Sequence, residues 1–265
     1  MTSTFDPGRS GLLIGMVHVL PLPGAPQWGG SMSAVLERAA RDATALAEAG
    51  FDALLVENFG DAPFFPDVVP PETIAGLTVV ASRVASVSAL PMGVNVLRND
   101  ARAALGIAAV VGASFMRINL HTGALLTDQG WITGRAHETL RQRRQLDSAV
   151  AICADVLVKH ATAPPGTDVA EVARDTYLRG GADVLIVSGP ATGMATDPAR
   201  ARAVKQAVPE VPLWIGSGIR AENIASFLTV ANGAIVGSSI KVNGQPAGAV
   251  DPTRAAALVS AARTG

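Results

Sequence analysis

Eight short apolar runs, each followed by a longer alanine-rich stretch, constrain the fold of this chain more than any other feature. Runs such as "ALLVEN" and "DVLIVS" are nearly continuous, which is typical of parallel strands covered on both faces. We expect strands over residues 12–19, 53–58, 92–97, 115–120, 152–159, 183–188, 213–216 and 234–237. We expect helices over residues 33–49, 72–89, 100–111, 136–150, 169–180, 198–207, 221–230 and 252–262.

This uninterrupted alternation predicts an α/β fold, a single (β/α)8 TIM barrel spanning residues 1–265. A doubly wound open sheet is the alternative, because its topological switch point leaves no mark in a sequence. The polar residues 1–11 are expected to form a flexible N-terminal extension. The loops over residues 59–71 and 121–135 are long and follow strands, so they are candidate lids over a site or ordinary decoration.

Composition narrows the class of partner. The formal net charge is −1 and 16% of the residues are charged, which disfavours nucleic acid and anionic membrane surfaces. No apolar run approaches the ~18 residues that span a bilayer, and no signal peptide is recognisable. The single cysteine, Cys153, excludes an intrachain disulfide and fits a cytoplasmic protein with a buried, inert thiol. Apolar helix faces are compatible with a homo-oligomer.

Two glycine-rich turns end the last two strands, at "IGSG" and "VGSS". In a barrel these turns are neighbours, and small residues there expose backbone N–H groups and hydroxyls that attract phosphate. The competing interpretation is that the glycines only make tight turns. No G-x-x-x-x-G-K-[ST] motif occurs, so we expect a small phosphorylated metabolite as partner rather than a nucleoside triphosphate. The expected substrate- or phosphate-binding residues are Asn95, Ser188, Gly189, Gly216, Ser217, Gly218, Gly237 and Ser238.

Polar side chains gather at the ends of the predicted strands. Burial of a charge there costs free energy unless a partner or a ligand compensates it, so such a cluster indicates a site. The expected catalytic residues are His18, Glu57, Arg117, Asn119, Asp155 and Lys159. His18 and Glu57 are candidates for proton transfer. Lys159, one of only three lysines, could form a Schiff base or act as a cation for substrate oxygens.

Two alternatives remain open for these residues. Arg117 with Asp155 or Glu57 would make a satisfied internal ion pair and nothing more. His18 and Glu57, joined by His121 or His160, could hold a divalent metal, but no H-x-H or H-E-x-x-H spacing supports it. We therefore predict no cofactor and no metal site.

Several unusual runs occur in order along most of the chain and together resemble the BtpA/SgcQ family. They are "GMVHVLPLPGAP", "DALLVENFGDAPF", "GVNVLRND", "FMRINLHTG", "TDQGWITG", "ADVLVKHA", "VSGPATGMATD" and "IGSGIRAENI". The resemblance implies a single-domain barrel related to phosphate-binding (β/α)8 proteins. It carries no established catalytic residues.

The resemblance also widens the functional expectation. The cyanobacterial namesake is associated with photosystem I biogenesis, and the SgcQ branch is labelled with sugar catabolism or nucleotide hydrolysis. We expect an enzyme that acts on a small phosphorylated metabolite by isomerase, aldolase or lyase chemistry. The alternative is a non-catalytic assembly factor that retains a ligand-binding barrel.

Overall fold

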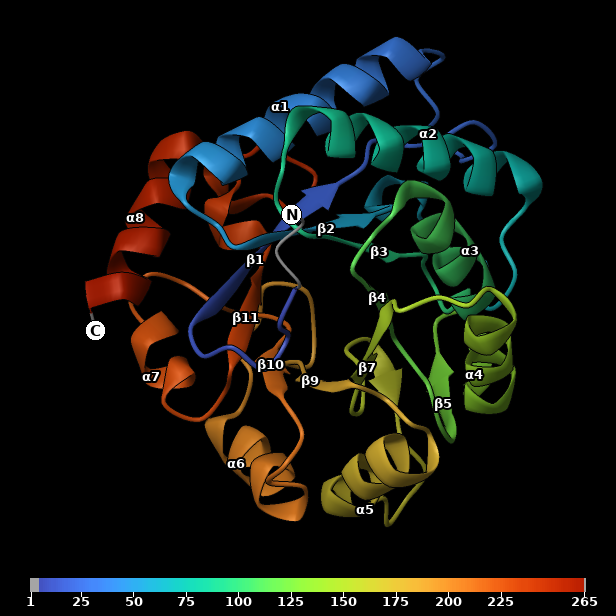
Figure 1. Ribbon diagram of the computed structural model, residues 1–265, viewed down its shortest axis with the longest axis vertical. Coiled ribbons are helices and arrows are strands. Elements are labelled where there is room, and N and C mark those ends of the chain that lie inside the picture. The colour runs from blue at the N-terminus through green and yellow to red at the C-terminus, as the bar shows by residue number, and fades with distance from the viewer. Residues whose placement is uncertain (1–4, 265) are drawn as a thin grey trace.

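A closed barrel of eight parallel strands forms the centre of the computed structural model, which describes residues 5–264 (Figure 1). Around the barrel the strands run β1-β11-β10-β9-β7-β4-β3-β2, so that the first strand pairs with both the second and the last. Helices surround the ring of strands (Figure 1). The predicted TIM barrel is therefore confirmed, and the open-sheet alternative is wrong.

The barrel elements follow the expected alternation of strand and helix. The strands are β1 (Leu12–His18), β2 (Ala53–Glu57), β3 (Met92–Asn95), β4 (Phe115–Ile118), β7 (Ala151–Asp155), β9 (Val184–Val187), β10 (Leu213–Ile215) and β11 (Gly233–Val236). The helices are α1 (Met32–Ala49), α2 (Pro71–Val87), α3 (Ala101–Val111), α4 (Ala136–Gln145), α5 (Val169–Arg174), α6 (Pro198–Ala207), α7 (Ile224–Leu228) and α8 (Pro252–Thr264). A π-helical turn, η2 (Asp175–Arg179), extends α5. None of these described helices is long and apolar enough to cross a membrane.

Residues that follow the N-terminus close one end of the barrel. Phe5 stacks on Phe115 with ring centroids 5.0 Å apart, and the indole N–H of Trp214 donates to the Pro7 carbonyl at 3.0 Å. The Asn232 amide donates to the Gly8 carbonyl at 2.8 Å. Of the flexible extension predicted over residues 1–11, residues 1–4 lie outside the described part, and the residues from Phe5 onward pack against the barrel.

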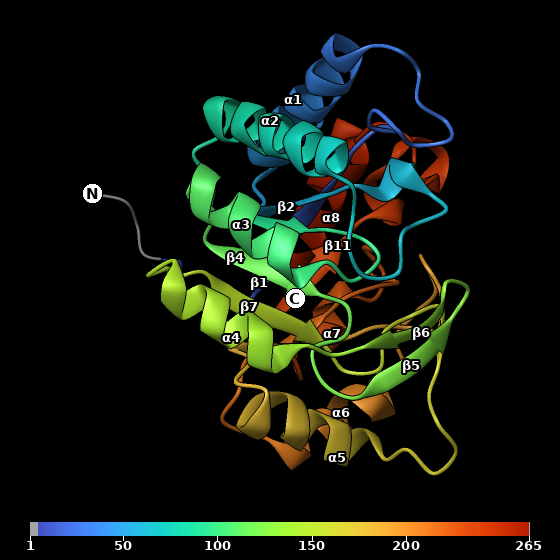
Figure 2. The same cartoon turned by 90° about the vertical axis from the view of Figure 1, so that its right-hand side faces the viewer.

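The opposite end carries the long loops. Within residues 121–135, β5 (Ala124–Thr127) and β6 (Gly130–Thr133) form a hairpin that pairs with β8 (Ala161–Thr162) in an antiparallel sheet. Figure 2 shows this hairpin projecting at the end of the barrel away from the N-terminus. The other long loop contains a single 3-10 turn, η1 (Phe59–Asp61).

Two elements are shorter than the sequence predicts. The strand expected over residues 152–159 ends at Asp155, because the chain turns there and Leu157 adopts a left-handed conformation with φ of 57°. The helix expected over residues 221–230 is confined to Ile224–Leu228. Residues 216–223 instead form an extended turn that faces the cavity described below.

Candidate functional site

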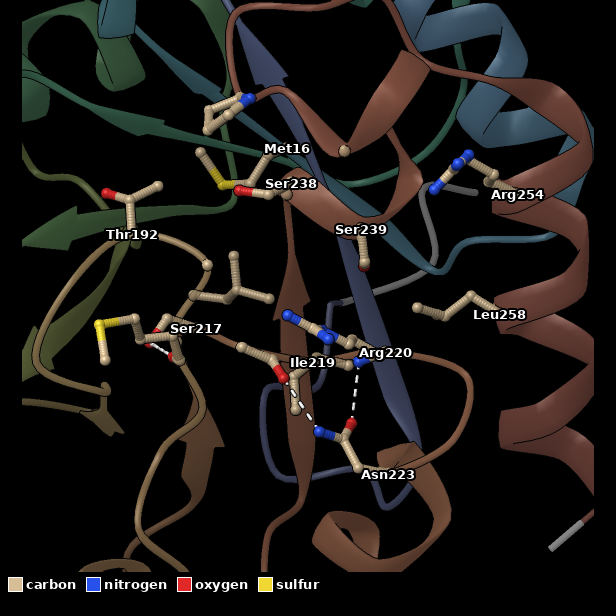
Figure 3. A pocket seen from close by; sticks show the side chains of 18 of the residues that line it. Met16, Thr192, Ser217, Ile219, Arg220, Asn223, Ser238, Ser239, Arg254 and Leu258 are labelled. Carbon is tan, nitrogen blue, oxygen red and sulfur yellow. Dashed lines mark hydrogen bonds between the residues drawn. The ribbon is translucent and has the colours of Figure 1, made fainter.

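A cavity of about 960 Å³ opens at the carboxyl ends of the strands. Side chains of His18, Glu57, Arg117 and Lys159 line its inner part. Its outer wall is formed by the turn over residues 216–223, by η3 (Ser238–Ile240) and by α8 (Figure 3). The cavity therefore brings most of the predicted catalytic side chains together with both predicted phosphate turns.

Alternation along the strands explains why these side chains point inward. Met16 of β1 and Phe115 of β4 belong to the apolar cluster inside the barrel, and the positions two residues further along are His18 and Arg117. The same spacing places Glu57 after the inward-facing Leu55. The inner core ends where these polar residues begin.

Glu57 and His18 form the proton-transfer part of the site. The Asn95 amide donates to Glu57 Oε2 at 2.6 Å, and Glu57 Oε1 lies 3.7 Å from His18 Nε2. His18 Nδ1 lies 2.8 Å from the Pro246 carbonyl, which can only accept, so Nδ1 carries the proton and Nε2 presents a lone pair. Burial, assisted by the Lys241 charge, lowers the pKa of His18 to about 3. His18 is therefore a neutral hydrogen-bond acceptor at neutral pH.

Arg117 and Asp155 form a buried ion pair, one of the two interpretations that the sequence left open. Arg117 Nε and Nη2 donate to the two Asp155 oxygens at 2.8 and 3.0 Å. The Ser188 hydroxyl donates to Asp155 Oδ1 at 2.8 Å. The Asp155 carboxylate thus accepts three hydrogen bonds within the protein and holds Arg117, while its direct role in catalysis stays a prediction. Ser188 likewise serves this pair and is absent from the residues that line the cavity.

Lys159 is a cation in the inner part of the cavity, and its amine has no partner among residues 5–264. It lies on the turn after β7, and the described residues provide no hydrogen bond or ion pair for its amine. Burial, followed by the Arg117 charge, lowers the pKa of Lys159 to about 8. Sequence analysis missed Arg98, which donates through Nη2 to the Lys159 carbonyl at 2.6 Å. Arg98 fixes the backbone of the turn that carries Lys159.

The glycine turn at 216–218 is built differently from the prediction. The Gly216 N–H donates to the Val187 carbonyl at 2.8 Å, and the Gly189 N–H donates to the Ser217 hydroxyl at 2.7 Å. The Ser217 hydroxyl in turn donates to the Met194 carbonyl at 3.2 Å. These three groups are therefore paired within the protein: Gly216 is bound to the end of β9, and Ser217 holds the loop that contains Gly189 and Met194.

Close packing explains why glycine occupies these positions. A Cβ on Gly218, which has φ of 71°, would collide with the backbone of residues 194 and 195. A Cβ on Gly216 would lie 2.5 Å from Ser188 Oγ. At Gly237 a Cβ would lie 3.3 Å from His18 Cε1, so this glycine leaves room above the imidazole. Close packing thus accounts for the glycines at 216 and 218, whereas a phosphate contact of the Gly218 N–H stays a prediction.

Further hydroxyl and guanidinium groups line the cavity at η3, on the turn over residues 216–223 and on α8. Ser238 and Ser239 line the cavity, and the buried Ser239 Oγ lacks a hydrogen-bond partner in the part of the chain that the structure describes. Arg220 reaches into the same space as Ser239 from the turn before α7, and Arg254 enters from α8 (Figure 3). Asn223 shapes the turn by accepting from the Arg220 N–H at 2.8 Å.

Of the residues that line this wall, the sequence analysis did not single out Arg220 and Arg254. Arg220 lies two residues after the predicted glycine turn, and that proximity was the available signal. Arg254 lies on the last helix and reaches the cavity only through the fold.

Two further predicted residues, Asn95 and Asn119, each keep a side-chain oxygen without a hydrogen-bond partner among the described residues. Asn119 is 1% exposed, and the Oδ1 atoms of Asn119 and Asn95 have no partner among the described residues.

Residues 5–264 contain no group of three or more side chains that could hold a metal. His121 donates to the Gly180 carbonyl at 2.8 Å, and His160 accepts from the Thr192 N–H at 3.1 Å. Both imidazoles are thus engaged away from His18 and Glu57.

Comparisons with known proteins agree with this architecture. A family model described as the BtpA family matches residues 9–264. The photosystem I biogenesis protein BtpA of Synechocystis is 48% identical over 254 residues, which cover 96% of this chain and 88% of that protein.

Solved structures show the likeness at the level of the fold. A chain of tryptophan synthase from Mycobacterium tuberculosis superposes with a TM-score of 0.63 at 17% identity, covering 98% of this chain and 95% of that one. Phosphoribosyl anthranilate isomerase from Thermus thermophilus superposes with a TM-score of 0.59 at 11% identity, covering 96% and 98%. At such identities the likeness concerns the barrel and not the chemistry.

Proposed function

This chain belongs to the BtpA family, and from that premise we propose that it is a cytoplasmic enzyme acting on a small phosphorylated metabolite. The observation that carries the proposal is the shared cavity, in which anion-binding groups and proton-transfer groups line different walls. A ligand with a phosphate at one end and a reactive carbon at the other fits this arrangement. The reaction that we propose runs on side chains alone.

The phosphate is proposed to bind between η3 and the two arginines. Ser239 offers a buried hydroxyl without a partner, Ser238 offers a second hydroxyl, and Arg220 offers a guanidinium that makes no ion pair within residues 5–264. Arg254 is shared with Asp251 at 3.6 Å and supplies additional positive charge. Guanidinium groups bind phosphate through paired N–H donors, which gives both affinity and orientation.

The reacting carbons then lie over the inner part of the cavity. Glu57, held by Asn95, is proposed to move a proton to or from the substrate. Neutral His18 accepts a hydrogen bond from a substrate hydroxyl, and Lys159 acts on the carbonyl group of the substrate. Arg117 adds positive charge nearby but is held by Asp155. Isomerisation, aldol cleavage and lyase chemistry all use this set of groups.

Ligand-induced stabilisation tests the binding part of the proposal. A phosphorylated ligand at 100 times its Kd should raise the free energy of unfolding by about 2.7 kcal/mol, which is visible as a higher Tm. We expect Arg220→Ala to reduce the shift produced by inorganic phosphate or sugar phosphates. Arg202→Ala, an exposed arginine on α6, should leave it unchanged. Equal shifts in both variants, or none in the wild type, would contradict the phosphate assignment.

Turnover tests the catalytic part. Once a stabilising sugar phosphate is found, Glu57→Gln and Lys159→Met should abolish its conversion while the Tm shift persists. A second candidate function, an assembly factor, is favoured by the relative that is named a photosystem I biogenesis protein. That candidate predicts that both substitutions leave the biological role of the protein intact.

A further inference from the structure

The three lysines of the chain lie in three different environments. Lys205 donates to the Val211 carbonyl at 3.0 Å on the outside of the barrel. Lys241 is 0% exposed and donates to the Met16 carbonyl at 2.9 Å and to Asp42 at 3.1 Å. Lys159 lines the cavity, and its amine has no hydrogen-bond or ion-pair partner in the described residues. Only Lys159 combines a free amine with access to a ligand.

The carboxylates nearest to Lys159 are already engaged. Glu57 accepts from Asn95 at 2.6 Å, and Asp155 accepts from Arg117 and Ser188. Arg117 and Arg98 add positive charge beside the amine, and both disfavour its protonated form. Burial together with these charges brings the pKa of Lys159 to about 8, so that a substantial fraction of the amine is unprotonated near neutral pH.

A lysine placed to hold a phosphate would be surrounded differently. It would lie beside the other anion-binding groups and would keep its charge. Lys159 instead shares the inner part of the cavity with Glu57 and His18, whereas Ser239 and Arg254 line the outer wall. This separation of roles favours a chemical function for the amine.

We propose that Lys159 is the nucleophile of this site and forms an iminium with the carbonyl carbon of a phosphorylated aldehyde or ketone. The inference rests on the proposed function, because it assumes that the phosphate is held on the outer wall. It goes further by naming the bond that forms and the class of substrate that can form it.

The atoms of this step balance. The Lys159 ammonium first gives a proton to Glu57. The freed Nζ lone pair then adds to the carbonyl carbon, and the carbonyl π electrons move to oxygen, which takes up a proton. Nζ loses a proton to give a neutral carbinolamine. The hydroxyl group then takes up a proton and leaves as water while the Nζ lone pair forms the C=N bond. The net change converts an ammonium and a carbonyl into an iminium and water, and Glu57 is the group that carries the protons between these atoms.

Reductive trapping tests this step on the wild-type protein. The protein is incubated with sodium cyanoborohydride and glyceraldehyde 3-phosphate or dihydroxyacetone phosphate, and the modified lysine is found by peptide mass spectrometry. Unphosphorylated glyceraldehyde and dihydroxyacetone are the matched probes. We expect saturable labelling of Lys159, about tenfold or more faster than labelling of Lys205, because the unpaired Lys159 amine lies in the cavity that binds the probe, whereas Lys205 donates to Val211 outside the barrel. The advantage of the phosphorylated probes should be lost in Arg220→Ala.

The possible outcomes separate this inference from the proposed function. Equal, unsaturable labelling of Lys159 and Lys205 overturns the inference, as does an absence of adduct while inorganic phosphate still raises the Tm. In the second case phosphate binding stands. Absence of both overturns both. If Lys159→Met weakens the stabilisation by inorganic phosphate more than Arg220→Ala does, then the lysine is an anion ligand and the inference is wrong.

Discussion

Removal of the Asp155 charge should destabilise the protein strongly, because the guanidinium of Arg117 that it pairs with is almost completely buried. The Arg117 side chain is 2% exposed, and its hydrogen bonds to Asp155 at 2.8 and 3.0 Å provide the only carboxylate bound to it in the described residues. Leaving such a charge buried and unpaired costs about 3–5 kcal/mol. For a chain of this size 1 kcal/mol corresponds to about 2–4 °C in Tm, so Asp155→Asn should lower Tm by roughly 6–20 °C.

A double variant separates two contributions to the loss of stability: the loss of the ion pair itself, and the burial of an unpaired Arg117 charge. Replacing both partners, as in Arg117→Met with Asp155→Leu, removes the unpaired charge, and we expect most of the stability to return. Calorimetric Tm values at constant pH and salt provide the measurement. A loss below about 1 kcal/mol for Asp155→Asn, or a double variant no more stable than the single one, would refute the reasoning that burial makes this pair costly to break.

Three further predictions follow from the geometry. The pKa of His18 is about 3 in the folded protein and 6.5 in the unfolded chain. The contribution of neutral His18 to stability is therefore fully present above pH 6.5 and is lost as the pH falls towards 3. Urea titrations should show a shallower loss of stability for His18→Gln than for the wild type or for His137→Gln, which changes an exposed histidine. Ser217→Ala should cost about 1–2 kcal/mol locally and speed hydrogen exchange over residues 189–194, while the affinity for inorganic phosphate stays the same; the opposite pattern would restore Ser217 as a ligand. Gly218→Ala should lower the free energy of unfolding by about 1–3 kcal/mol, because the new Cβ would collide with residues 194 and 195. Gly106→Ala lies in open space on α3 and should raise it by about 0.5–1 kcal/mol. Similar Tm values for the two variants would contradict the packing argument.

Periodicity made most of the fold predictable from the sequence. Side chains alternate between the two faces of a strand, and His18 and Arg117 are too polar to face the helices, so an inward position was the expectation that the structure meets. The pattern failed for the strand that carries Lys159, because Leu157 turns left-handed and ends the alternation. Lys159 nevertheless reaches the cavity, through a loop conformation that no period describes.

The sequence indicated only the region of the proposed phosphate site. Glycines at 216 and 218 indicated a close approach, and the structure shows that Ser188 makes that approach at Gly216 and the loop over residues 194–195 makes it at Gly218. Which partner a glycine accommodates depends on contacts between distant segments, which one sequence does not record. The same holds for Arg254, which comes to the cavity from the last helix.

The pairing of β1 with β11 closes the barrel and has a consequence for folding during translation. Strand β1 pairs with β11, and Asp52 accepts the Leu13 N–H while binding Arg9 and Arg263 from the two ends of the chain. A nascent polypeptide leaving the ribosome therefore exposes one hydrogen-bonding edge of β1 until nearly all of the sequence has been translated. Prematurely terminated products would retain that edge, which is the kind of surface on which chains associate wrongly. Chaperones that bind nascent chains would therefore meet the barrel while its β1 edge is still unpaired.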